Sequence, residues 1–139
     1  CVGLRQAAEK AADAGLEIDT LCADLLEAAL PEGGFALCAS IFLHLPPGRR
    51  AAGHARMAAA LTPGGLLILE SYAPGHEVLR ARHQSGGPPD PAWLHDPAAL
   101  RADFAGLEEL FLETIERRLF EGPFHDGPGR VVRAIFRKP

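Results

Sequence analysis

The sequence predicts an α/β fold whose mixed sheet ends in an antiparallel hairpin. Three observations support this. Helix-period and strand-period segments alternate over residues 2–71 with short links, as in the βαβ units of a doubly wound sheet. The almost purely apolar run 35–42 is typical of a strand covered on both faces. Two strand-like segments, 107–120 and 131–136, are joined by a turn-rich link, so we expect them to be antiparallel neighbours.

The first half of the chain alternates between the two periodicities. Residues 2–15 carry apolar side chains at helical spacing, and Gly15 is expected to end this helix. Residues 16–22 alternate apolar and polar side chains and predict a strand. A short helical turn or loop over 25–31 then leads to the buried strand at 35–42.

The second half begins with a helix expected from Pro46-Pro47 to Leu61, since proline is favoured in the first helical turn. Pro63-Gly64-Gly65 should stop it and lead into a buried strand over 66–71. Residues 75–91 are expected to form a loop.

A further helix is predicted where Asp96 provides an N-cap and Pro97 the first helical residue, with Gly106 at its end. The long strand over 107–120 follows directly. Residues 123–129 are expected to form the turn that precedes the last strand.

Composition limits the functional classes. The chain has 139 residues, 47% of them apolar and 23% charged, which is ordinary for a soluble globular domain. A net charge of −4 without a basic run argues against an obligate nucleic-acid partner. No stretch has the length of a membrane-spanning helix and no signal-peptide pattern is present, so we expect a cytoplasmic protein.

The three cysteines, Cys1, Cys22 and Cys38, lack the close spacing of a zinc site, and reduced thiols are expected. No metal site is predicted. The chain begins with cysteine inside a predicted helix, which leads us to expect a piece of a longer protein.

Three segments in order carry a family resemblance: 21–25 with its Asp after a strand, 34–45, and 61–70 with its Pro-Gly-Gly turn. Together with the C-terminal hairpin, they resemble a class I S-adenosylmethionine-dependent methyltransferase. Residues 40–47, and the segment from Gly86 onward, look most like the small tellurite-resistance-type branch. The resemblance implies that residues 1–139 are a partial methyltransferase domain with a Rossmann-like sheet, truncated before the family's second helix. It also implies S-adenosylmethionine as cofactor and a small molecule or metalloid as methyl acceptor.

The resemblance assigns four cofactor-binding residues. Asp24 would accept a hydrogen bond from the adenine amine, because a carboxylate only accepts, and the backbone of Leu25 would meet the ring. Alternatively, Asp24 simply caps the turn after the strand. Ser40 and Ile41 would lie near the methionine part, since ligands of open α/β sheets bind at the carboxyl ends of the strands. The alternative is that Ser40 satisfies a strand end locally.

His44 and Tyr72 are the candidate substrate-binding residues. His44 could orient an acceptor or take its proton, because imidazole titrates near neutral pH. Alternatively, His44 is a loop histidine without a functional role, and Tyr72 is a core residue whose ring ends in a polar hydroxyl. No catalytic residue is predicted, because the cofactor supplies an activated methyl group and positioning carries most of the rate.

The glycine-rich cofactor loop of the family is missing from these residues. The one Gly-x-Gly, at 127–129, neither follows a parallel strand nor opens a helix. A second hypothesis is therefore a non-catalytic module that forms a homodimer or binds another partner through an exposed sheet edge. A third, a nucleotide-dependent oxidoreductase, is disfavoured by the antiparallel hairpin.

Overall fold

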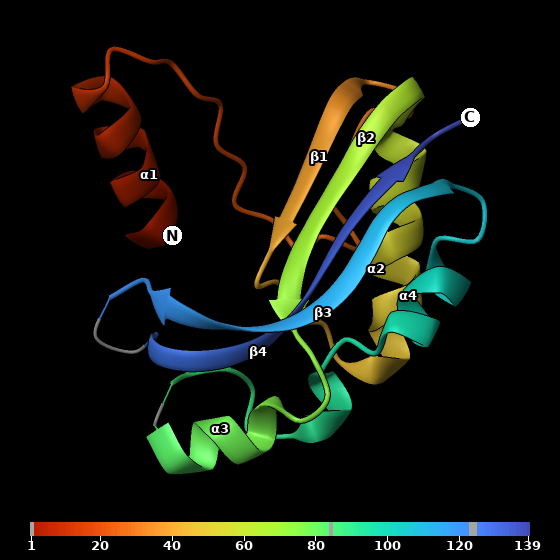
Figure 1. The fold of residues 1–139 in the computed structure, drawn as a ribbon. Coiled ribbons are helices and arrows are strands. Elements are labelled where there is room, and N and C mark those ends of the chain that lie inside the picture. The colour runs from red at the N-terminus through yellow and green to blue at the C-terminus, as the bar shows by residue number, and fades with distance from the viewer. Residues whose placement is uncertain (1, 84, 123–124) are drawn as a thin grey trace.

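The computed structural model describes residues 2–83, 85–122 and 125–139 and shows a four-stranded mixed sheet in the order β1-β2-β4-β3 (Figure 1). Helices α2 and α4 lie behind the sheet in this view, and α3 lies below it. In chain order the elements are α1 (Val2–Asp13), β1 (Phe35–Ile41), α2 (Pro47–Ala60), β2 (Leu61–Tyr72), α3 (His76–His83), a 3-10 turn (Pro91–Trp93), α4 (Pro97–Asp103), β3 (Glu108–Phe120) and β4 (Asp126–Arg137).

Strands β1 and β2 are parallel and are connected through α2, which confirms the predicted βαβ unit. Helix α2 begins at Pro47, where a missing N–H costs no helical hydrogen bond, and it ends where Leu61 becomes extended. The predicted α4 is also confirmed, because the Asp96 carboxylate accepts hydrogen bonds from the Ala98 and Ala99 N–H groups.

The C-terminal hairpin is confirmed. Strand β4 pairs antiparallel with β2 on one side and with β3 on the other. The turn predicted over 123–129 is wrong in part, because β4 already begins at Asp126 and Gly129 pairs with Arg117. Pro123 lies outside the described residues.

The main core lies between the sheet and the helices α2 and α4. Alternate side chains of β2 and β4 point into it and meet the inner sides of both helices. Its buried members are Met57, Leu61, Leu67, Leu69, Ala73, Leu100, Phe104, Val132, Ala134 and Phe136.

Three predictions about the first hundred residues are wrong. Pro63-Gly64-Gly65 do not stop the helix, because α2 already ends at Ala60 and the three residues lie within β2. Residues 16–22 form no strand; they have no neighbouring strand to pair with, and Leu16, Ile18 and Leu21 stay exposed. The expected loop over 75–91 contains α3. The Glu77 carboxylate accepts the Gly75 N–H at 2.8 Å, and basic side chains in the last turn suit the negative end of the helix.

Helix α1 is confirmed and leads into Gly15 with φ +70°, but none of its residues is buried. Figure 1 shows α1 and the segment after it set apart from the sheet. Within the described residues, no helix is long and apolar enough to cross a membrane.

The cysteines differ from expectation. Cys38 is a free, half-buried thiol on β1, but Cys22 is disulfide-bonded, so the prediction of reduced thiols is wrong for Cys22. Cys1 lies outside the described residues.

The Pro-Gly-Gly segment is attached to the last residues of the chain. Gly64, with φ +77°, donates its N–H to the Lys138 carbonyl at 2.8 Å, and the Lys138 N–H returns a 2.9 Å bond to the Gly65 carbonyl. The Lys138 ammonium also donates to the Ala59 and Leu61 carbonyls. These bonds hold the start of β2 in place.

Gly65 has no room for a side chain. A Cβ there would lie 2.8 Å from the Thr62 carbonyl oxygen and 3.2 Å from those of Phe35 and Ala36, all backbone atoms. We predict that Gly65→Ala lowers the free energy of unfolding by about 1–3 kcal/mol, as overpacking does. Urea unfolding measures this. Gly106→Ala, where a Cβ meets nothing within 4 Å, is the control and should change little; equal effects would contradict the explanation.

Candidate functional site

The carboxyl ends of the parallel strands β1 and β2 meet at one edge of the sheet. The loop after β1 carries Phe42 and His44, and β2 ends at Tyr72. Asp24 lies at the same edge, because it is bonded to Arg49 at the start of α2, close behind that loop. His44 and Tyr72 therefore lie together at this edge, and Asp24 lies beside the start of α2.

Asp24 closes a turn. One carboxylate oxygen accepts the Leu26 N–H at 2.8 Å and the other accepts from the Arg49 guanidinium at 3.0 Å. These two bonds lower the pKa of Asp24, so the group is charged at neutral pH. Its carbonyl also accepts from Glu27 and Ala28. Leu25 packs partly against the core, and its carbonyl accepts from Arg56 at 2.7 Å.

Ser40 and Ile41 point to opposite faces of the sheet, as neighbours in a strand must. Ser40 pairs with Leu69 and is buried on the side of the helices. Ile41 pairs with Glu70 and is 56% exposed on the other side. Their side chains therefore cannot meet one ligand in the same way.

Phe42 is the one described non-glycine residue with a positive φ, +49°. This left-handed conformation is unusual for a bulky residue and persists where the surroundings hold it. Here the Phe42 N–H donates to the Glu70 carbonyl at 2.8 Å, and its ring packs on Tyr72 with centroids 4.8 Å apart. Nothing in the sequence around Phe42 signals this conformation.

His44 is fixed by two hydrogen bonds. Its Nδ1 lies 2.9 Å from the Trp93 carbonyl, which only accepts, so Nδ1 carries the proton. Its Nε2 is then the acceptor and lies 3.3 Å from the Ser71 hydroxyl. Burial lowers the pKa of His44 and keeps the ring neutral.

Tyr72 is buried, and its hydroxyl donates to the Ser85 carbonyl at 3.1 Å. Its ring stacks on His76 at 3.9 Å and on His44 at 5.7 Å. Burial raises the pKa of Tyr72 to about 12. The hydroxyl is therefore held inside the protein, and the ring supports Phe42 and His44.

A histidine cluster that the sequence does not reveal lies behind the edge, made of the half-buried His44 and the buried His54 and His95. The His95 ring lies 5.3 Å from His44 and 5.4 Å from His54, centroid to centroid. The His54 Nδ1 is bonded to Asp103 at 2.8 Å, and Arg50 bonds the same carboxylate oxygen. Only tertiary structure brings these positions together, so their spacing in the chain carries no signal.

His95 is 1% exposed, and neither ring nitrogen has a hydrogen-bond partner among the described residues. Burial, together with the neighbouring His44 and His54, lowers its pKa to about 3. The unfolded chain takes up this proton near pH 6.5, so His95 favours the folded state above that pH. The contribution is lost as the pH falls toward 3.

We predict that His95→Phe flattens the pH dependence of stability. Between pH 7 and pH 5, the variant should lose about 2 kcal/mol less unfolding free energy than the parent chain. Urea unfolding at both pH values measures the difference. The exposed His83→Gln is the control and should behave like the parent. The same pH slope in both variants would show that His95 does not titrate as inferred.

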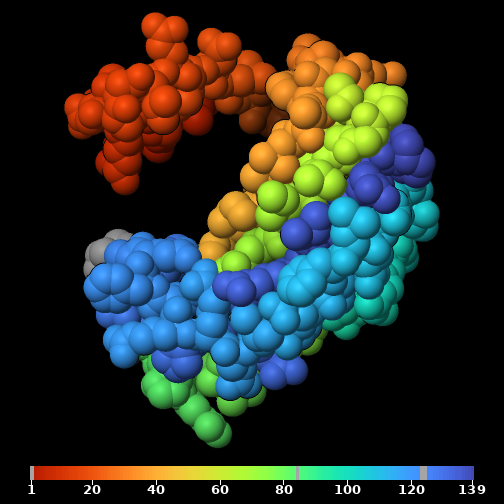
Figure 2. All heavy atoms as spheres, turned by 45° about the horizontal axis from the view of Figure 1, so that its top comes forward, coloured from red at the N-terminus to blue at the C-terminus, as the bar shows by residue number. Residues whose placement is uncertain are grey.

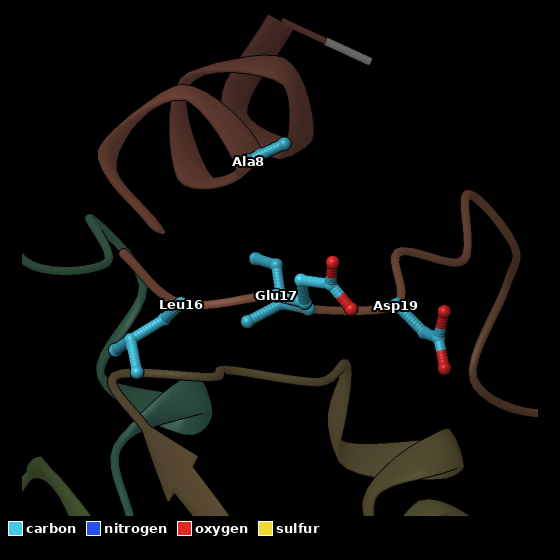
Figure 3. A pocket seen from close by; sticks show the side chains of 5 residues that line it. Ala8, Leu16, Glu17 and Asp19 are labelled. Carbon is cyan, nitrogen blue, oxygen red and sulfur yellow. The ribbon is translucent and has the colours of Figure 1, made fainter. Parts of the chain in front are cut away.

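A hollow of about 570 Å³ does not coincide with this edge. It lies between α1 and the extended segment after it and is lined by Ala8, Leu16, Glu17, Ile18 and Asp19 (Figure 3). These side chains gather no catalytic group. Within the described ranges, no group of three or more His, Cys, Asp or Glu side chains is placed to hold a metal ion.

Comparison with solved structures gives clear similarities in fold. An S-adenosylmethionine-dependent methyltransferase from Methanosarcina mazei has a TM-score of 0.71 at 14% identity, over 96% of this chain and 76% of that one. TehB from Haemophilus influenzae has a TM-score of 0.68 at 16% identity, over 94% of this chain and 44% of TehB. The [4+2]-cyclase SpnF has a TM-score of 0.66 at 18% identity, over 96% of this chain and 61% of SpnF.

No protein-family model matches the chain, and no curated protein matches it. The chain spans between 44% and 59% of three of the similar solved proteins. At these identities the likeness concerns the fold alone, and SpnF shows that proteins of this shape carry more than one activity. The fold of this chain is similar to that of class I S-adenosylmethionine-dependent methyltransferases.

Proposed function

We propose that this chain is part of an S-adenosylmethionine-dependent methyltransferase, acting in the cytoplasm on a small molecule or metalloid. The observation that carries the proposal is the carboxyl edge of β1 and β2, which carries Ser40, the left-handed Phe42 and His44, with Asp24 bonded to Arg49 at the start of α2. Open α/β sheets bind ligands at this edge. The similarity in fold to known methyltransferases supports the same assignment.

The residues at the edge fit part of such a cofactor. Asp24 is exposed and charged, and a carboxylate has about four acceptor sites, of which Leu26 and Arg49 occupy two. It can therefore accept an adenine amine as well. Ser40 and Ile41 would border the methionine part through their backbone. The bound cofactor would supply an activated methyl group.

The chain's own residues would position the acceptor. The half-buried Phe42 ring packs on Tyr72, which holds it in place. The unprotonated Nε2 of His44 lies 3.3 Å from the Ser71 hydroxyl, a long hydrogen bond. Ser71 is buried, so this Nε2 faces the interior, and His44 would orient an acceptor rather than take its proton. The Trp93 carbonyl keeps His44 in the required tautomer.

The ribose and the methionine carboxylate would lack their usual support. The glycine-rich loop that allows close backbone approach is absent from the 139 residues. We therefore predict that this chain binds S-adenosylhomocysteine with a dissociation constant weaker than about 1 mM. Isothermal titration calorimetry tests this, and micromolar binding would refute the inferred need for the loop.

The second candidate function is a non-catalytic module. The observation that favours it is strand β1, which lies at the edge of the described sheet and whose Phe35, Leu37 and Ile41 are 43%, 53% and 56% exposed. The codons upstream of Cys1 distinguish the two functions. A hydrophobic strand followed by a glycine-rich loop supports the enzyme, and a start or stop codon supports the module.

A further inference from the structure

Residues 90–95, which we call the strap, contain the 3-10 turn and lead into α4. They lie on the side of the sheet that carries α2 and α4, because the His95 ring packs against His54 of α2. Figure 2 looks onto the opposite side and shows the strands as adjacent stripes with no helix over them. The first three residues of the strap are exposed, whereas Leu94 and His95 are buried. The strap is therefore a surface segment anchored by two buried side chains.

Hydrogen bonds join the strap to the carboxyl edge of β1 and β2. The His95 N–H donates to the Tyr72 carbonyl at 2.8 Å. The Trp93 carbonyl accepts a proton from the His44 Nδ1, with the two atoms 2.9 Å apart. This second bond fixes the tautomer of His44, because a carbonyl only accepts. The position of the strap and the state of His44 are therefore linked: an open strap leaves His44 without its fixed tautomer.

The His95 ring anchors the strap at a cost. It is 1% exposed, and neither ring nitrogen has a hydrogen-bond partner among the described residues. Buried polar groups without partners are rare and need an explanation. An imidazolium donates from both nitrogens, so a proton taken up in place would add a second unpaired donor and a buried charge. The closed strap therefore requires a neutral His95.

The surroundings of His95 do not compensate for such a charge. The charged and titratable side chains that face it are His44 from the loop after β1, Arg50 and His54 from α2, and Asp103 from α4. Asp103 attracts a positive charge but is already bonded to Arg50 and His54. Tyr72 of β2 is neutral, because burial raises its pKa to about 12. Burial and the neighbouring cations therefore keep the proton away from the enclosed ring, whereas an exposed imidazole takes it up near pH 6.5.

We propose that uptake of one proton by His95 opens the strap and releases His44. The proton comes from solvent, the charged ring leaves the interior, and the bond from His44 to the Trp93 carbonyl breaks. The strap is closed above about pH 6.5, and below it each pH unit favours the open form by up to tenfold. The opening constant should thus rise about 30-fold from pH 7.5 to pH 5. This device goes beyond the proposed methyl transfer, since it concerns only how His44 is held.

The test is amide hydrogen exchange of the 139-residue chain, followed by NMR at pH 7.5 and pH 5. The observed rate divided by the intrinsic rate at each pH gives the opening constant of an amide. The His95 amide reports on the strap, and the Ala73 amide, which donates to the Arg130 carbonyl at 3.0 Å, reports on the sheet beside it. We expect His95 to open more readily than Ala73 at both pH values, with the 30-fold rise. Equal opening constants for the two amides would overturn the proposal, because the strap would then open only with the whole fold.

Variants identify the group that takes up the proton. His95→Phe should abolish the rise at position 95, and His95→Leu repeats this test should the first variant fail to fold. His83→Gln, at an exposed histidine of α3, is the matched control and should keep the rise. A rise that persists without His95 would overturn the proposal.

A further variant tests the link between the strap and His44. His44→Phe removes the bond to the Trp93 carbonyl but keeps His95, so it should increase opening about fivefold at both pH values and leave the rise in place. An unchanged opening constant would show that the strap does not hold His44. No cofactor or methyl acceptor enters these measurements, so they are independent of the proposed methyl transfer.

Discussion

The parallel pairing of β1 with β2 is the constraint on which the candidate site depends. Parallel strands cannot be joined by a tight turn, so the chain must cross over through α2 before it returns. The crossover places both carboxyl ends at one edge. It also brings the start of α2, with Arg49, next to that edge, where Arg49 holds Asp24. Much of the site geometry follows from this one pairing.

The sequence was sufficient for features that depend on local chemistry or on long apolar runs. Pro47 and Asp96 start helices where expected, and the hairpin follows from two long strands joined by a short link. It was not sufficient for the segment 16–22, whose alternation is that of a strand. Alternation shows that a segment is suited to pair, but a strand exists only where a partner lies beside it.

For the candidate residues, the sequence predicts a place along the chain but not their contacts. Ser40, Ile41, His44 and Tyr72 lie at or near the ends of β1 and β2, because these strand ends can be located from the sequence. Asp24 follows no strand, because residues 16–22 do not form one. The stacking of His44 and Tyr72, the conformation of Phe42 and the enclosure of His95 could not be predicted. They depend on contacts between α2, the segment after Trp93 and β2, which are far apart in the chain.

The bonds between Lys138 and the start of β2 have a consequence for how the protein is made. Gly64 and Gly65 precede Lys138 by more than seventy residues, yet their backbone groups are satisfied by it. During synthesis, β1, α2 and β2 leave the ribosome well before β4 and Lys138 do. Until then, backbone groups at the amino end of β2 lack their final hydrogen-bond partners. Contacts of such long sequence separation also form slowly. We therefore expect the nascent chain to need protection until its last strand has emerged.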